Sequence, residues 1–127
     1  MHPRPMGPPP RVLVIEGCEE VRRVLLEVLA NDGYDVHGVS TGKEGIEQFA
    51  QGPYDAVIAD VVARDDAGFE TIRLLHERSP RTVILAISAD ASPVLRTRAV
   101  ESGARHVFAK PFDIAGFLEA VRRSVPG

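Results

Sequence analysis

Four polar residues of this sequence stand at the ends of short apolar runs. They are Glu16 after "RVLVI", Asp60 at the end of "YDAVIAD", Ser88 at the end of "VILAIS" and Lys110 after "HVFA". Carboxylate oxygens suit a hard divalent cation such as Mg²⁺, which keeps several waters and takes only one or two carboxylates from the protein. A carboxylate can also attack phosphorus to form an acyl phosphate, while an ammonium and a hydroxyl bind the other phosphoryl oxygens. If the fold brings these four side chains together, they predict a site for phosphoryl chemistry.

The elements that must position these residues alternate along the chain. Short runs rich in Val and Ile predict strands at 11–16, 34–40, 54–61, 83–88 and 105–109. Apolar residues at helical spacing predict helices at 19–33, 41–52, 69–79, 93–103 and 114–125. Five strand–helix units with short connections indicate a doubly wound α/β domain, in which a five-stranded parallel sheet carries helices on both faces. Ligands of such sheets bind beyond the carboxyl ends of the strands, where all four polar residues lie.

Length and composition predict one domain, over residues 11–125, after a flexible Pro-rich tail at residues 1–10. No apolar run approaches the roughly 20 residues of a membrane span, and the first residues lack the apolar core of a secretory signal. We therefore expect a cytoplasmic protein without a membrane partner. A net charge of −3 with mixed signs predicts no contact with nucleic acid. The single cysteine, Cys18, excludes an internal disulfide and is expected to be a small buried thiol.

Taken together and in this order, the motifs resemble the receiver domains of two-component response regulators over nearly the whole chain. They are "VLVIEGCEEVR", "YDAVIADV", "VILAISA" and "GARHVFAKPF". The resemblance implies a (βα)5 flavodoxin-like receiver fold, in which Asp60 accepts a phosphoryl group from a phosphohistidine of a sensor histidine kinase or phosphotransfer protein. It also implies that Ser88 and Lys110 bind the phosphoryl group and that the Lys110–Pro111 peptide is cis, which would aim the lysine inward.

The same resemblance implies a Mg²⁺ site made by Glu16, Asp60 and the backbone carbonyl of Val62. Here the sequence departs from the family, because Gly17 stands where a second acid usually contacts the metal. We therefore expect weakened affinity for Mg²⁺. Asp65 and Asp66 could restore some of the missing charge, but a solvated loop is the favoured interpretation of both.

A second departure concerns the aromatic residue that usually changes rotamer three positions before the lysine. Its place is taken by Val107. The neighbouring Phe108 should point to the opposite face of the strand. Any movement on phosphorylation is therefore expected in the loop after Ser88 and in the fourth helix.

Three functions remain open at this point. The first is a phosphoacceptor module, not an enzyme in the usual sense, that binds a downstream protein through the face formed by the fourth helix, fifth strand and fifth helix. The second is a pseudo-receiver, a phosphate-independent binding or dimerisation module, which the pair Glu16-Gly17 supports. The third is a small nucleotide- or flavin-binding protein. It is disfavoured because "EGCEEVR" places acids where a phosphate loop needs backbone donors free of negative charge.

Overall fold

A computed structural model of the chain describes residues 7–110 and 113–125. Within them, five parallel strands form one sheet in the order β2-β1-β3-β4-β5. The strands are β1 (Arg11–Ile15), β2 (Asp35–Val39), β3 (Ala56–Asp60), β4 (Val83–Ser88) and β5 (His106–Ala109). The helices are α1 (Glu19–Asn31), α2 (Gly42–Phe49), α3 (Asp66–Arg78), α4 (Pro93–Ser102) and α5 (Ile114–Ser124). The predicted doubly wound α/β fold is confirmed.

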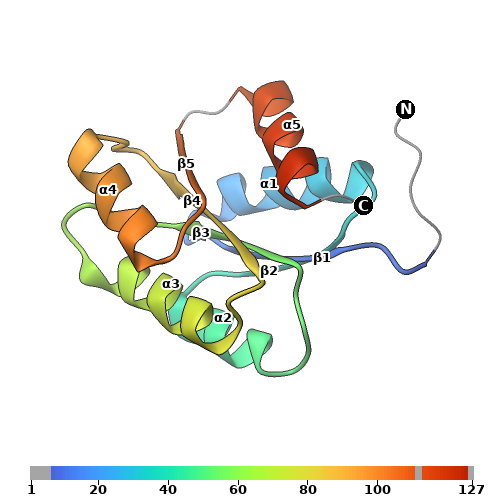
Figure 1. The fold of residues 1–127 in the computed structure, drawn as a ribbon. Coiled ribbons are helices and arrows are strands. Elements are labelled where there is room, and N and C mark those ends of the chain that lie inside the picture. Colours follow the sequence, from blue (N-terminus) through green and yellow to red (C-terminus); the bar gives the residue numbers. More distant parts are fainter. Residues whose placement is uncertain (1–6, 111–112, 126–127) are drawn as a thin grey trace.

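Helices cover both faces of the sheet. Figure 1 shows α1 and α5 on one face and α2, α3 and α4 on the other. The three central strands β1, β3 and β4 are almost entirely buried, whereas the edge strands β2 and β5 are partly exposed. Successive side chains of a strand point to opposite faces, so Leu13 packs toward α2–α4 and Val12 packs toward α1 and α5.

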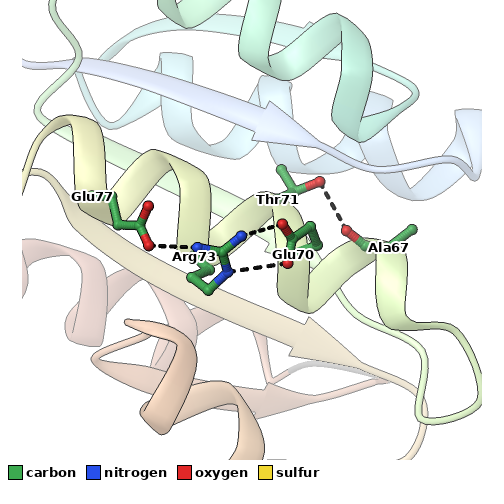
Figure 2. Close-up of polar contacts among 5 residues, drawn as sticks. All are labelled: Ala67, Glu70, Thr71, Arg73 and Glu77. Atoms are coloured by element: carbon green, nitrogen blue, oxygen red, sulfur yellow. Dashed lines mark hydrogen bonds and ion pairs between the residues drawn. The ribbon is translucent and has the colours of Figure 1, made fainter.

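The N-terminal turns of α2 and α3 lie close together. Thr71 of α3 is buried, and its hydroxyl donates a hydrogen bond of 2.9 Å to the carbonyl of Ala67, away from the exposed ion pairs around Arg73 (Figure 2). A Cβ atom placed on Gly42 at the start of α2 would lie 2.2 Å from Thr71 Oγ1. Only glycine fits this contact without displacing Thr71, so the position brings the start of α2 against α3.

All ten predicted elements are present, with bounds that differ from the prediction by at most three residues, at the end of α2 and the start of α3. Helix α3 begins earlier because Asp65 accepts a hydrogen bond of 2.9 Å from the Ala67 amide and so caps the helix. The prediction that Cys18 is buried is wrong: the residue is exposed, because it occupies the N-cap position of α1 outside the buried face of that helix.

Two further predictions fall partly outside the described residues. The cis peptide was expected at Lys110–Pro111, and residue 111 is not described. The flexible tail was expected at residues 1–10, of which residues 1–6 are not described. No helix in the described part of the chain has the length and apolar character needed to cross a bilayer.

Candidate functional site

The carboxyl ends of β1, β3, β4 and β5 meet at one edge of the sheet, and each predicted site residue lies there. Asp60 and Ser88 are the last residues of β3 and β4, while Glu16 and Lys110 come directly after β1 and β5. Backbone hydrogen bonds continue past the strand ends, from the Lys110 amide to the Ser88 carbonyl at 2.8 Å and from the Val61 amide to the Ile87 carbonyl at 2.8 Å. Parallel pairing therefore gathers residues from four separate parts of the chain.

Three charged side chains form the centre of this site. The ammonium of Lys110 lies 2.5 Å from Glu16 Oε1 and 3.1 Å from Asp60 Oδ1. The side chain of Glu16 is only 2% exposed, against 19% for Lys110 and 23% for Asp60. The other oxygen of Glu16, Oε2, accepts a hydrogen bond of 3.0 Å from the Cys18 amide. The lysine thus bridges a buried carboxylate and the accessible carboxylate of Asp60.

Burial and charge shift the protonation equilibria of the site. Burial and the nearby charge of Glu16 raise the pKa of the Asp60 carboxyl above its usual value, although contact with Lys110 opposes this change. For Lys110, burial favours the neutral amine, but hydrogen bonds and charge interactions with Glu16 and Asp60 outweigh burial and raise the pKa of the ammonium. Lys110 is therefore a permanent positive charge next to Asp60 at neutral pH.

Asp60 opens onto two hollows, each of about 280 Å³. The first lies between the β3–α3 and β4–α4 loops. Its lining consists of Asp60, Val61, Val62, Ala63, Arg64, Ser88, Ala89, Asp90 and Lys110. The second lies beside Gly17, among the first turns of α2 and α3. A reactant of phosphate size can therefore reach the Asp60 carboxylate.

Ser88 lies at the first hollow, as the sequence predicts, but its hydroxyl is engaged elsewhere. It is 1% exposed, and its oxygen both donates to the Asp90 carbonyl and accepts from the Asp90 amide, each at 3.1 Å. In this arrangement the hydroxyl holds the β4–α4 loop. The side chain would have to leave Asp90 to bind a group on Asp60.

The described residues can hold a divalent cation only if water molecules supply most of its ligands. The described residues include no cluster of three or more His, Cys, Asp or Glu side chains placed to hold a metal. The available oxygen donors are the carboxylates of Glu16 and Asp60, which both contact Lys110 in this arrangement, and the carbonyl of Val62, which also accepts the Asp65 amide at 3.0 Å. A Cβ atom on Gly17 would meet only the Ser40 carbonyl, at 3.6 Å, so there is space for water where an acid is missing. Two carboxylates with several waters match the usual preference of Mg²⁺.

The two acids at the start of α3 make contacts that stabilise helices. Asp65 caps α3, and Asp66, whose side chain is 86% exposed, forms an ion pair of 2.5 Å with Arg98 of α4. Neither contact involves Asp60.

Val107 stands where an aromatic residue is usual, and it and the neighbouring Phe108 point to opposite faces of the sheet, as predicted. Val107 is 8% exposed and packs on the face covered by α2–α4. Phe108 points to the other face, where its ring meets Phe117 edge-on with centroids 5.3 Å apart. Phe108 therefore does not take over the place of an aromatic residue at 107.

Sequence reasoning missed two arginines that hold the loops of this site. Arg22 of α1 donates a hydrogen bond of 2.8 Å to the Glu16 carbonyl, and Arg96 of α4 donates to two carbonyls, one in the β4–α4 loop and one in β5. Nothing in their sequence context distinguishes them from solvated helix arginines.

A parallel five-stranded α/β sheet with two acids, a hydroxyl and a lysine at its carboxyl edge defines the class of receiver-like domains. The sequence matches the response regulator receiver domain family over residues 12–122, and the chain belongs to this family. Membership of this family argues against a nucleotide- or flavin-binding protein.

Relatives and solved structures agree with this assignment. The chain is 30% identical to the uncharacterized transcriptional regulatory protein YkoG of Bacillus subtilis over 90% of its length, but spans only 50% of that protein. It is 26% identical to the chemotaxis protein CheY of Thermotoga maritima, covering 89% of this chain and 95% of CheY. A response regulator structure from Thermotoga maritima shares the fold with a TM-score of 0.86 at 24% identity, covering 94% of this chain and 99% of the other.

Proposed function

We propose that this receiver domain accepts a phosphoryl group on Asp60 from a phosphohistidine of a sensor histidine kinase or phosphotransfer protein. The observation that carries the proposal is the Asp60 carboxylate at the end of β3, which faces an open hollow and contacts the ammonium of Lys110 at 3.1 Å. Nucleophile and fixed positive charge are thus adjacent.

In the transfer, a carboxylate oxygen of Asp60 forms a bond to phosphorus while the P–N bond of the phosphohistidine breaks. The imidazole nitrogen keeps the electron pair of that bond and takes up a proton. Lys110, held by the buried Glu16, offers its positive charge to the phosphoryl oxygens. Ser88 can donate to the same oxygens once its hydroxyl leaves Asp90.

We propose Mg²⁺ as the cofactor, with Glu16, Asp60 and the Val62 carbonyl as its protein ligands. Bound there, the ion would neutralise part of the phosphoryl charge. Because Gly17 contributes no side chain, water must fill the position of the missing acid, and the affinity should be lower than that of a site with three acids.

The domain would act in the cytoplasm as a signalling module, not as an enzyme in the usual sense. Phosphorylation adds negative charge and hydrogen-bond acceptors at Asp60, which would shift the β4–α4 loop and thereby the face formed by α4, β5 and α5. A downstream protein or a second copy of the chain would bind that face.

The test is intact-mass spectrometry after incubation with acetyl phosphate, with and without Mg²⁺. We expect the wild type to gain one phosphoryl group in a Mg²⁺-dependent manner and Asp60→Asn to gain none. Asp66→Asn is the matched control, because the Asp66 carboxylate is 86% exposed and outside the site, and it should be labelled like the wild type. Labelling of Asp60→Asn at the wild-type level would refute Asp60 as the acceptor.

A second function, the pseudo-receiver, has its own support. Both oxygens of Glu16 already have partners, Gly17 provides no acid, and the Ser88 hydroxyl is bound to Asp90. This function predicts no phosphoryl gain and no Mg²⁺ binding by titration calorimetry. Binding of a partner or dimerisation should then be the same for the wild type and Asp60→Asn, as measured by light scattering.

A further inference from the structure

Helix α4 is held to the domain by a small apolar face. It buries Leu95 and Ala99, while two of its other apolar side chains, Val94 and Val100, are exposed. An element with few buried contacts is held at the low end of local stability. Polar contacts of α4 therefore contribute to its attachment.

Arg96 makes the most specific of these contacts. Its Nε donates a hydrogen bond of 2.9 Å to the carbonyl of Ala91 in the β4–α4 loop, and its Nη1 donates one of 3.0 Å to the carbonyl of Val107 in β5. Since β5 pairs with β4 alone among the described strands, the Val107 bond lies at an edge of the sheet. One guanidinium thus joins the loop, the helix and the edge strand.

The loop that Arg96 holds is linked to the phosphorylation site by a chain of hydrogen bonds. Ser88 Oγ bonds the amide and the carbonyl of Asp90. Asp90 Oδ1 accepts from the Ser92 amide at 3.2 Å, and Ser92 Oγ accepts from the Leu95 amide at 3.3 Å, which caps α4. Ala91, whose carbonyl binds Arg96, lies in the middle of this chain.

We propose that Arg96 is the positioning residue that couples the state of Ser88 to β5 and α4. When the Ser88 hydroxyl turns from Asp90 to a group on Asp60, Asp90 loses both bonds, the Ala91 carbonyl moves, and Arg96 releases its hold on Val107. The trigger rests on the proposed function of Asp60. The link through Arg96 can be tested without any phosphoryl group.

The test uses hydrogen–deuterium exchange of peptides covering residues 89–96 and 105–110, in the unmodified protein. Arg96→Lys keeps the charge but loses the planar fork that reaches both carbonyls. It should speed exchange in both peptides about threefold to tenfold, the effect of losing one hydrogen bond. Arg98→Lys is the matched control, because Arg98 lies on the same helix and contacts neither carbonyl: it pairs with the exposed Asp66 and lies over the Phe69 ring of α3. It should change exchange of these two peptides by less than about twofold, because its contacts are with α3 and not with β5 or the β4–α4 loop.

A double-mutant cycle then tests coupling. Ser88→Ala should speed exchange in peptide 105–110 of the wild type, but should add nothing in the Arg96→Lys background, where the link is already cut. Equal acceleration by Ser88→Ala in both backgrounds would overturn the proposal, and so would unchanged exchange of peptide 105–110 in Arg96→Lys. Acetyl phosphate labelling is read separately by intact mass. A failure to label would refute the phosphoacceptor function while leaving the result on Arg96 intact.

Discussion

Replacing Lys110 by methionine tests how the site is held together, because the ammonium is the partner of a buried charge. The side chain of Glu16 is 2% exposed and its Oε1 lies 2.5 Å from Lys110 Nζ. Lys110→Met keeps the length and apolar stem of the side chain but leaves the carboxylates of Glu16 and Asp60 facing each other. A buried carboxylate without its cation is costly.

Burial sets how much free energy of unfolding Lys110→Met should lose. Removing one partner of a buried pair costs about 3–5 kcal/mol, and the low end applies because Lys110 itself is 19% exposed. A loss of about 3 kcal/mol lowers the Tm of a domain of this size by about 10 °C. Glu16→Gln should cost only about 1 kcal/mol, since an amide oxygen still accepts the Cys18 amide and Asp60 keeps Lys110.

The assay is urea unfolding at neutral pH of the wild type, both single variants and the double variant. In the Glu16→Gln background, Lys110→Met should cost about 1 kcal/mol, so the two residues couple by about 2 kcal/mol. Because contacts with the carboxylates raise the pKa of Lys110, this stabilisation is complete at neutral pH. It should be lost only as the pH rises above the usual lysine value of 10.5 and through the raised pKa. Lys43→Met, at the exposed second lysine, is the control and should stay within about 0.5 kcal/mol of the wild type.

Two results would contradict this account. If Lys110→Met destabilises the wild type and the Glu16→Gln background equally, the buried carboxylate is not stabilised by the lysine. If Lys110→Met costs no more than Lys43→Met, the ion pair contributes nothing to folding.

Three further predictions concern neighbouring residues. Burial and a neighbouring carboxylate raise the pKa of Asp60, so ionisation of this carboxyl opposes folding. Asp60→Asn should therefore have a higher Tm than the wild type at neutral pH and the same Tm at acid pH, as measured by calorimetry across pH. Gly17→Asp should increase Mg²⁺ affinity in titration calorimetry, since the added Cβ meets only the Ser40 carbonyl at 3.6 Å; unchanged affinity would show that water already serves equally well. Gly42→Ala should cost about 1–3 kcal/mol in urea unfolding because its Cβ would lie 2.2 Å from Thr71 Oγ1, and Thr71→Ala should relieve most of that cost.

Much of this architecture is present in local patterns. Alternating apolar runs and helical periodicities predict all ten elements, and α4 begins at Pro93, the residue where the prediction of a helix at 93–103 places its start. The polar residue at the end of each apolar run is equally readable. Given parallel strands, chain connectivity alone requires these ends to meet at one edge.

Other features could not be read from local patterns. The exposure of Cys18 depends on how the β1–α1 loop meets solvent, and the bonds of Ser88 depend on the turn that Asp90 completes. Arg96 looks like any exposed helix arginine until β5 brings the Val107 carbonyl within reach.

The sequence by itself thus determined which elements form and which residues end the strands, because both depend on the spacing of apolar residues along the chain. Only the tertiary structure decided that Glu16 is buried, that Lys110 bridges it to Asp60, and that Gly17 leaves room beside them. The physical reason is that burial and ion pairing depend on contacts between segments distant in the chain, whose distances are set only when the strands pair.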